Sequence, residues 1–281
     1  MKTRGIITIA TGNSLYGRLA YNLAVTIKAT GTKIPICLIC DTKAIAHLNA
    51  TQRKMFDQFV FTDLQWNEIR FSIDQLSPFD HTMQLDADLL WLWKDPVALF
   101  DQSKSLNFLA TNYGSFNAAT KVEQVTGDYL WWCDVKRACT EYNIKGKIFQ
   151  SCFELVIWRK GSVVSKILSE AKAIRENPLV KVKQFEDAVC DEFCFNVSAS
   201  LAGVSMVSPW LPIKRATKCR SKTIRQLSDE MYAISFAGSR AADDERKLYD
   251  TIMEAACFKS GLKHVFKLQS KREHIKTRKS I

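Results

Sequence analysis

The sequence predicts an α/β fold in which helices flank a largely parallel sheet. Short apolar runs of strand length alternate with stretches of helical apolar spacing through the first hundred residues. The apolar fraction of 47% and the charged fraction of 25% are average for globular proteins, which excludes a collagenous or wholly disordered chain. The length of 281 residues suits one large domain or two smaller ones.

The elements of the first half follow from this spacing. Residues 6–10 form a compact apolar run that is typical of a strand. Apolar residues then recur at helical spacing between Ser14, the expected N-cap, and Gly31, the expected stop signal. Further strands are predicted at 34–40, 58–62 and 81–85, with 89–93 continuing the last of them, and helices at 44–56 and 97–100.

The second half is more mixed. Apolar runs predict strands at 106–111, 148–158, 205–208 and 231–236, and helical spacing predicts helices at 162–176, 184–201 and 243–258. The sequence shows no internal repeat and no linker rich in proline, glycine or serine. We therefore expect the two halves to be lobes of one compact unit.

Neither a signal peptide nor a membrane span is expected. No apolar run approaches ~18 residues, and the run behind the N-terminus is too short for a signal-peptide core. We therefore expect a cytoplasmic location, with the nine cysteines as reduced, buried thiols. Cys37 and Cys40 have the spacing of a redox or zinc pair, but strand alternation would point them to opposite faces.

Positive charge is concentrated in two segments. The chain has 40 Lys and Arg against 29 Asp and Glu, a net charge of +11. Residues 214–225 hold six basic residues and no acid, and residues 259–281 hold eight against one glutamate. Such charge favours an anionic partner, whether nucleic acid, an acidic membrane surface or a phosphorylated substrate. A merely solvated tail is the alternative for 259–281.

The triplet Asp86-Ala87-Asp88 ends the predicted strand 81–85. Residues two apart in a strand face the same way, so both carboxylates would project together from its carboxyl end. Ligands bind at that end of open α/β sheets. Paired carboxylates there suit Mg²⁺ or Mn²⁺ on a diphosphate, whose charge the metal would neutralise as it leaves. The alternative is two solvated carboxylates in a turn.

The segment that contains this triplet resembles the metal-binding segment of GT-A-fold glycosyltransferases. It reads FDHTMQLDADLL and then DPVALF, and the pattern of glycogenin and the lipooligosaccharide galactosyltransferases is the most similar. Weaker matches follow in the family's order at Ala10-Thr11-Gly12-Asn13, 149–157, 190–196 and 233–238. The resemblance implies a GT-A fold: a Rossmann-like, mostly parallel nucleotide-binding sheet with a mixed acceptor lobe.

The resemblance also implies roles for particular residues. Asp86 and Asp88 would hold Mn²⁺ or Mg²⁺ on a nucleotide-diphosphate sugar, and Ser235 occupies the place of a third metal ligand. The candidate catalytic residues are Asp191, Glu192 and Gln150. The candidate residues for the donor nucleotide are Ala10, Thr11, Gly12, Asn13, Tyr16, Asp41, Asp86, Lys214, Arg215 and Gly238.

Two residues depart from the family pattern. Ser235 stands where the family has a metal-ligating histidine, and a hydroxyl is a far weaker ligand. Glu192 stands where the retaining enzymes have glutamine. A carboxylate there could act as a base for inversion, as a nucleophile, or as an ion-pair stabiliser of the transition state. Without the resemblance, Asp191 and Glu192 read as part of an acidic helix face in water.

We therefore expect a metal-dependent glycosyltransferase. Its lobes would be a nucleotide-sugar-binding lobe at 1–105 and an acceptor-binding lobe at 106–258, with a basic tail at 259–281. Residues 214–225 would close over the donor pyrophosphate as a lid or contact an anionic acceptor.

The acceptor is left open by the sequence. Trp131 and Trp132 are a candidate stacking platform for it, with a core role as the alternative. A hydroxymethylated DNA base, as in phage enzymes, fits the charge, and so does a membrane-linked or phosphorylated glycan. The basic segments 214–225 and 259–281 would then contact DNA or an anionic membrane. The competing hypothesis is a non-catalytic basic module that binds nucleic acid or membrane.

Overall fold

A computed structural model describes most of the chain. The described residues are 3–64, 66–112, 119–125, 133–182, 184–185, 188–204, 207–219, 222–236 and 243–262. The strands of the main sheet are β1 (Arg4–Ala10), β2 (Ile36–Cys40), β3 (Gln58–Phe61), β4 (His81–Leu85), β5 (Leu89–Trp91), β6 (Phe108–Asn112), β9 (Leu155–Arg159), β12 (Val207–Arg215) and β13 (Ala233–Ser235).

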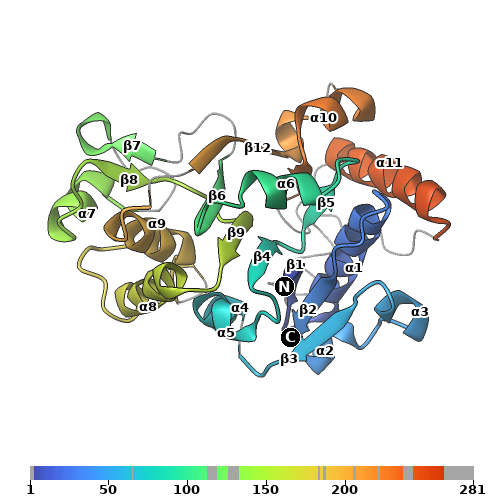
Figure 1. Ribbon diagram of the computed structural model, residues 1–281, viewed down its shortest axis with the longest axis horizontal. Helices are drawn as coiled ribbons and strands as arrows, with labels where there is room; N and C mark the ends of the chain where they lie inside the picture. Colours follow the sequence, from blue (N-terminus) through green and yellow to red (C-terminus); the bar gives the residue numbers. More distant parts are fainter. Residues whose placement is uncertain are drawn as a thin grey trace.

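Within the described residues these nine strands form one sheet in the order β3-β2-β1-β4-β9-β6-β12-β13-β5 (Figure 1). The pairs from β3 to β4 are parallel, as are β6 with β12 and β12 with β13. β9 runs antiparallel to β4 and β6, and β5 runs antiparallel to β13. The predicted α/β fold with a mostly parallel sheet is confirmed.

Helices cover both faces of this sheet. The helices in the described part of the chain are α1 (Ser14–Lys28), α2 (Thr42–Ile45), α3 (Ala50–Arg53), α4 (Trp66–Ile69), α5 (Ile73–Leu76), α6 (Val97–Gln102), α7 (Val135–Glu141), α8 (Ser162–Glu176), α9 (Asp191–Leu201), α10 (Ile224–Glu230) and α11 (Asp243–Ser260). Three 3₁₀ turns are η1 (Arg70–Ser72), η2 (Val122–Gln124) and η3 (Ala216–Lys218). Two small antiparallel pairs join β7 (Ala119–Lys121) to β8 (Lys147–Phe149) and β10 (Gln184–Phe185) to β11 (Ala188–Val189).

Each face of the sheet has its own apolar core. Ile6 of β1 packs in the core that includes α1 and α11, and its neighbour Ile7 packs in the core that includes α8 and α9. These two helix pairs lie on opposite sides of the molecule in Figure 1. Cys37 and Cys40 fall in different cores, as strand alternation predicts, and all nine cysteines are buried free thiols.

The helix boundaries correct two expectations. Asn13, not Ser14, caps α1, because its side-chain oxygen accepts a hydrogen bond from the Leu15 amide at 2.9 Å. The single helix predicted at 44–56 is wrong: the chain forms α2 and α3 there. Asn49 interrupts it, because its side chain and that of Gln52 form a capping box that starts a new helix.

The prediction that residues 89–93 continue the strand 81–85 is wrong, because the two segments form separate strands that are not neighbours in the sheet. After β4 the chain turns at Asp86–Asp88, and β5 pairs with β13 at the far edge of the sheet. The backbone bond from the Leu89 amide to the Asp86 carbonyl, 3.2 Å, closes this turn. The aspartates therefore lie where the chain changes its position in the sheet.

Two other long predictions are also wrong. The strand predicted at 148–158 divides into β8 and β9, because Phe153 has a left-handed backbone with φ of 53°. The helix predicted at 184–201 begins only at Asp191, after the β10–β11 hairpin. That start places Asp191 and Glu192 in the first turn of α9.

The main sheet takes strands from both sides of the predicted lobe boundary at residue 105. The division into lobes therefore stays a prediction. Among the described residues, no helix has both the length and the apolar character that a membrane crossing requires.

Candidate functional site

The loop after β1 is tied to the end of β2. The Gly12 amide donates to Asp41 Oδ2 at 2.7 Å, and the Ala44 amide donates to Asp41 Oδ1 at 2.7 Å. Gly12 has φ of 86°, a backbone conformation that favours glycine. Asp41 therefore holds two loops together at the carboxyl ends of neighbouring parallel strands, where nucleotides bind in such sheets.

The other residues expected at the donor nucleotide lie on the same loop. Ala10 and Thr11 are buried at the end of β1. The Thr11 hydroxyl has no hydrogen-bond partner among the described residues. Asn13 caps α1, and Tyr16 in its first turn is 38% exposed. The structure thus brings these residues together, and their contact with a nucleotide stays a prediction.

The Asp86–Asp88 turn is held by backbone bonds to two other strands. The Asp86 amide donates to the Glu154 carbonyl at 2.9 Å, and the Phe236 amide donates to the Asp88 carbonyl at 3.1 Å. These bonds link the end of β4 to the start of β9 and the end of β13. Three distant parts of the chain therefore meet at this turn.

Arg70 joins the triplet to α9. Its Nη2 donates to Asp86 Oδ1, and its Nη1 donates to Asp191 Oδ2 at 2.8 Å. The side chains are 13% exposed for Arg70, 24% for Asp86 and 12% for Asp191, so solvent screens these ion pairs little. Arg70 could not be predicted as a site residue, because nothing in its local sequence marks it.

Glu154 and Ser235 form a buried pair below the turn. The Ser235 hydroxyl donates to Glu154 Oε1 at 3.0 Å, and Ser235 is fully buried. Glu154 is 8% exposed, and its second oxygen, Oε2, has no hydrogen-bond partner among the described residues. The role of Ser235 as a metal ligand stays a prediction, and its hydroxyl is engaged with Glu154.

Asn196 fastens the loop between β8 and β9 to α9. Its side-chain oxygen accepts from the Ser151 amide at 2.6 Å, and its Nδ2 donates to the Ser151 carbonyl at 2.8 Å and the Glu192 carbonyl at 2.7 Å. Gln150, which precedes Ser151, is 7% exposed. Asn196 therefore ties the backbone at Glu192 to the loop that carries Gln150 and Ser151.

Buried acidic side chains dominate this site. Burial raises the pKa of Asp86 to about 7, although Arg70 opposes the shift, and burial together with Asp191 raises the pKa of Glu192 to about 8. Burial, Asp88 and Asp86 raise the pKa of Glu154 well above its ordinary value. Each carboxylate penalises the ionised form of the others. An added cation would relieve that penalty.

The donor chemistry of these residues fits a divalent cation. Carboxylate oxygens are the ligands that Mg²⁺ and Mn²⁺ prefer. Within the described ranges, no group of three or more His, Cys, Asp or Glu side chains is placed to hold a metal ion. Mg²⁺ commonly binds one or two carboxylates together with substrate phosphates. Asp86 and Asp88 therefore fit a cation whose remaining ligands come from a diphosphate.

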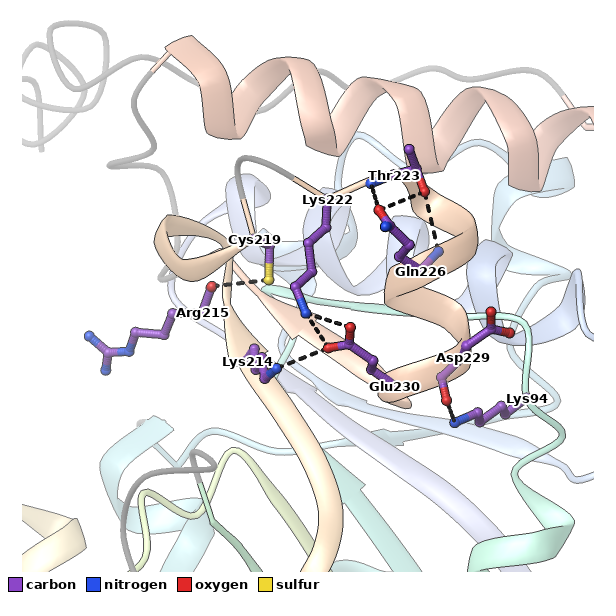
Figure 2. A network of polar contacts seen from close by, with 9 residues as sticks. All are labelled: Lys94, Lys214, Arg215, Cys219, Lys222, Thr223, Gln226, Asp229 and Glu230. Carbon is purple, nitrogen blue, oxygen red and sulfur yellow. Dashed lines mark hydrogen bonds and ion pairs between the residues drawn. The ribbon is translucent and has the colours of Figure 1, made fainter.

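The expected lid at 214–225 contains regular structure in its described residues, from the end of β12 through η3 to the start of α10. Figure 2 shows Lys214 and Lys222 converging on Glu230, with Lys214 Nζ 3.1 Å from Glu230 Oε2. Arg215 points away from that cluster in Figure 2, and its charge acts on Glu154 and Glu192. Neighbouring strand residues point to opposite faces, so Lys214 pairs with Glu230 while Arg215 lies on the side of Glu154 and Glu192.

Several predicted site residues lie outside the described part of the chain. They are the acceptor candidates Trp131 and Trp132, the donor candidate Gly238, and residues 263–281 of the basic tail. Their roles stay predictions.

The fold is that of solved glycosyltransferase structures. The apo structure of the bifunctional glycosyltransferase WbbM aligns with 91% of this chain, with a TM-score of 0.57 and 14% identity. The galactosyltransferase LgtC, in complex with donor and acceptor sugar analogs, aligns with 93% of it, with a TM-score of 0.55 and 12% identity. GlyE of Streptococcus pneumoniae aligns with 90% of it, with a TM-score of 0.50 and 11% identity.

These likenesses confirm the expected GT-A-type fold. The aligned region is 97% of the LgtC chain, 60% of the GlyE chain and 50% of the WbbM chain, so this chain spans half the length of WbbM. No protein-family model matches the sequence, and no curated protein matches it.

Proposed function

We propose that the protein is a metal-dependent glycosyltransferase that moves a sugar from a nucleotide-diphosphate donor to an acceptor. One observation carries the proposal. The Asp86–Asp88 turn lies at the carboxyl end of β4, and Arg70 joins it to Asp191 at the start of α9. This acidic site occurs in a fold shared with solved glycosyltransferases.

Asp86 and Asp88 would hold Mn²⁺ or Mg²⁺ against the donor diphosphate. When bound, the cation neutralises negative charge on the nucleoside-diphosphate leaving group. Asp41 orders the Gly12 loop at the ends of β1 and β2, where the nucleotide would lie. Arg70 binds both Asp86 and Asp191, so it would hold the metal-binding carboxylate at a fixed position relative to the residues on α9 that face the sugar.

Asp191, Glu192 and Gln150 would act on the transferred sugar. Burial and Asp191 favour the neutral form of Glu192, whereas Arg70 and Arg215 favour its ionised form. A base or a nucleophile needs the ionised form, and positive charge brought to the site supplies it. The stereochemistry of the product distinguishes these roles: inversion supports the base, and retention supports the nucleophile or the ion-pair stabiliser.

The acceptor proposed here is anionic. The net charge of +11 favours a DNA strand with hydroxymethylated bases, or a membrane-linked or phosphorylated glycan. Trp131 and Trp132 are proposed to stack on it. The structure of LgtC, whose fold this chain shares, contains an acceptor sugar analog. Of the two acceptors, the glycan is therefore the one that resembles the acceptor of a solved structure.

A thermal-shift screen of nucleotide sugars, with and without Mn²⁺, tests the proposal. A specific donor stabilises the fold by an amount that grows with the logarithm of its concentration divided by its Kd, and the stabilisation should require Mn²⁺. Asp88→Asn should abolish the Mn²⁺-dependent part, whereas the exposed Asp63→Asn should keep it. If every nucleotide sugar leaves the wild-type melting temperature unchanged, the non-catalytic binding module replaces this proposal.

A further inference from the structure

A small cavity lies beside Arg70, on the side of the sheet that α8 and α9 cover. Its volume is about 20 Å³, which is enough for at least one water molecule. Three polar side chains line it, those of Arg70, Gln84 and Trp158, and the rest of its lining is apolar. The cavity is therefore a polar spot inside an apolar core.

Trp158 brings a buried hydrogen-bond donor to this cavity. The residue is 1% exposed, and its indole Nε1 has no hydrogen-bond partner among the described residues. A buried N–H group without a partner is costly, and ordered water commonly supplies the partner in proteins. The position of this donor in the cavity lining points to a molecule that can accept a hydrogen bond there.

Gln84 faces the same cavity from the neighbouring strand. It lies on β4 directly opposite Val156 of β9, and Val156 and Trp158 stand on one face of the sheet because they are two residues apart. Gln84 is 6% exposed, although that face packs against an apolar core. A glutamine amide both donates and accepts hydrogen bonds, so Gln84 can bind a small polar molecule next to Trp158.

Arg70 supplies the third polar group. Its guanidinium has five N–H groups, and its bonds to Asp86 and Asp191 account for two of them. The side chain is 13% exposed, so bulk solvent reaches it little. A polar molecule in the cavity would add a partner for the guanidinium on the side of the core.

The chemistry of the lining selects water among small ligands. Empty cavities in proteins are lined by apolar groups, whereas a buried water needs two to four polar partners. A small anion is disfavoured, because Asp86 and Asp191 already balance the charge of Arg70 and would repel a further negative charge.

We propose that the cavity binds an ordered water that accepts hydrogen bonds from Trp158 Nε1 and the Arg70 guanidinium and donates one to Gln84 Oε1. Gln84 and Trp158 are then positioning residues: through the water they hold Arg70, which in turn holds Asp86 and Asp191. This inference goes beyond the proposed function and does not depend on a metal or a sugar.

Nuclear magnetic resonance of the protein without metal or nucleotide tests the water directly. The chain has seven tryptophans, and Trp158→Phe assigns the indole N–H signal of Trp158 in deuterated protein with ¹⁵N-labelled tryptophan. A water held in the cavity gives that proton nuclear Overhauser cross-peaks to water that have opposite signs in the laboratory and rotating frames. Exchange of the proton with solvent gives cross-peaks of the same sign. Absence of the cross-peaks, or equal signs, in the wild type would overturn the proposal.

Gln84→Leu tests the positioning role, because it keeps the approximate size of the side chain and removes the amide. We expect the Trp158 cross-peaks to be lost and the Arg70 Nε proton, assigned with Arg70→Lys, to exchange with solvent at least ~10-fold faster. Gln58→Leu makes the same change at an exposed position on β3 and should leave both signals as in the wild type. If Gln84→Leu also leaves the exchange of the Arg70 proton unchanged, Gln84 does not hold Arg70 and the inference is wrong, while the proposed function is unaffected.

Discussion

Arg70 is the residue on which the charge balance of the site depends. It binds Asp86 and Asp191 with a side chain that is 13% exposed, and its removal leaves two largely buried carboxylates without their cation. Arg70→Ala should therefore lower the free energy of unfolding by about 3 kcal/mol. Urea denaturation at neutral pH measures it. Arg137→Ala breaks an exposed pair with Glu141 and should change stability by less than ~0.5 kcal/mol. Equal losses in the two variants would contradict the role given to Arg70.

Some of the site residues could be predicted from the sequence, and others could not. Asp86 and Asp88 stood out because a close pair of carboxylates followed a strand. Arg70 did not, because its partner Asp191 is 121 residues away and only the folded chain brings them together. Glu154 lay inside what looked like one apolar strand. The folded chain brings it to the Asp86 amide and the Ser235 hydroxyl, and apolar spacing does not reveal either contact.

At the scale of elements, β4 carries a pH-sensitive residue at its start. His81 is fully buried, with its ring 4.9 Å from that of Phe100, between centroids. Burial, and then Arg159 and Arg4, lower its pKa to about 4. In the unfolded chain the imidazole of His81 binds a proton near pH 6.5, whereas in the folded chain it stays neutral down to about pH 4. The free energy of unfolding is therefore at its full value above pH 6.5 and decreases as the pH falls toward 4.

Unfolding in urea at pH 7.5 and pH 5 tests this assignment. Between these values, His81→Gln should lose less stability than wild type by about 2 kcal/mol, because its side chain does not titrate. Parallel losses in the two proteins would show that His81 does not contribute to the pH dependence.

The elements that apolar spacing predicted well are those that pack along their whole length. Helix α8 has the predicted bounds, because a continuous apolar stripe faces one core. The prediction was wrong for 44–56 and 148–158, where a polar side chain or a special backbone conformation determines where an element ends. Asn49 starts a new helix through its capping box, and Phe153, with its left-handed backbone, lies in the break between β8 and β9. Apolar periodicity does not register either feature.

At the scale of the whole molecule, the positive charge belongs largely to 214–225 and 259–281. In the first segment, Glu230 neutralises part of this positive charge through Lys214 and Lys222.

We expect duplex DNA to be retarded by the protein in gel electrophoresis at about 50 mM salt, and the binding to weaken steeply toward 200 mM. Glu230→Gln frees two lysines and should bind more tightly than wild type. No retardation at 50 mM would remove DNA as the acceptor and leave the glycan.

The central claim is that Asp86 and Asp88 hold a catalytic metal on a nucleotide sugar. Hydrolysis of the donor that the thermal-shift screen selects, measured with Mn²⁺, tests it most directly. Wild type and Asp63→Asn should release nucleoside diphosphate at the same rate, and EDTA should stop both. Asp86→Asn combined with Asp88→Asn should lower that rate by at least ~100-fold while the protein stays folded. Unchanged turnover in this double variant would contradict the assignment.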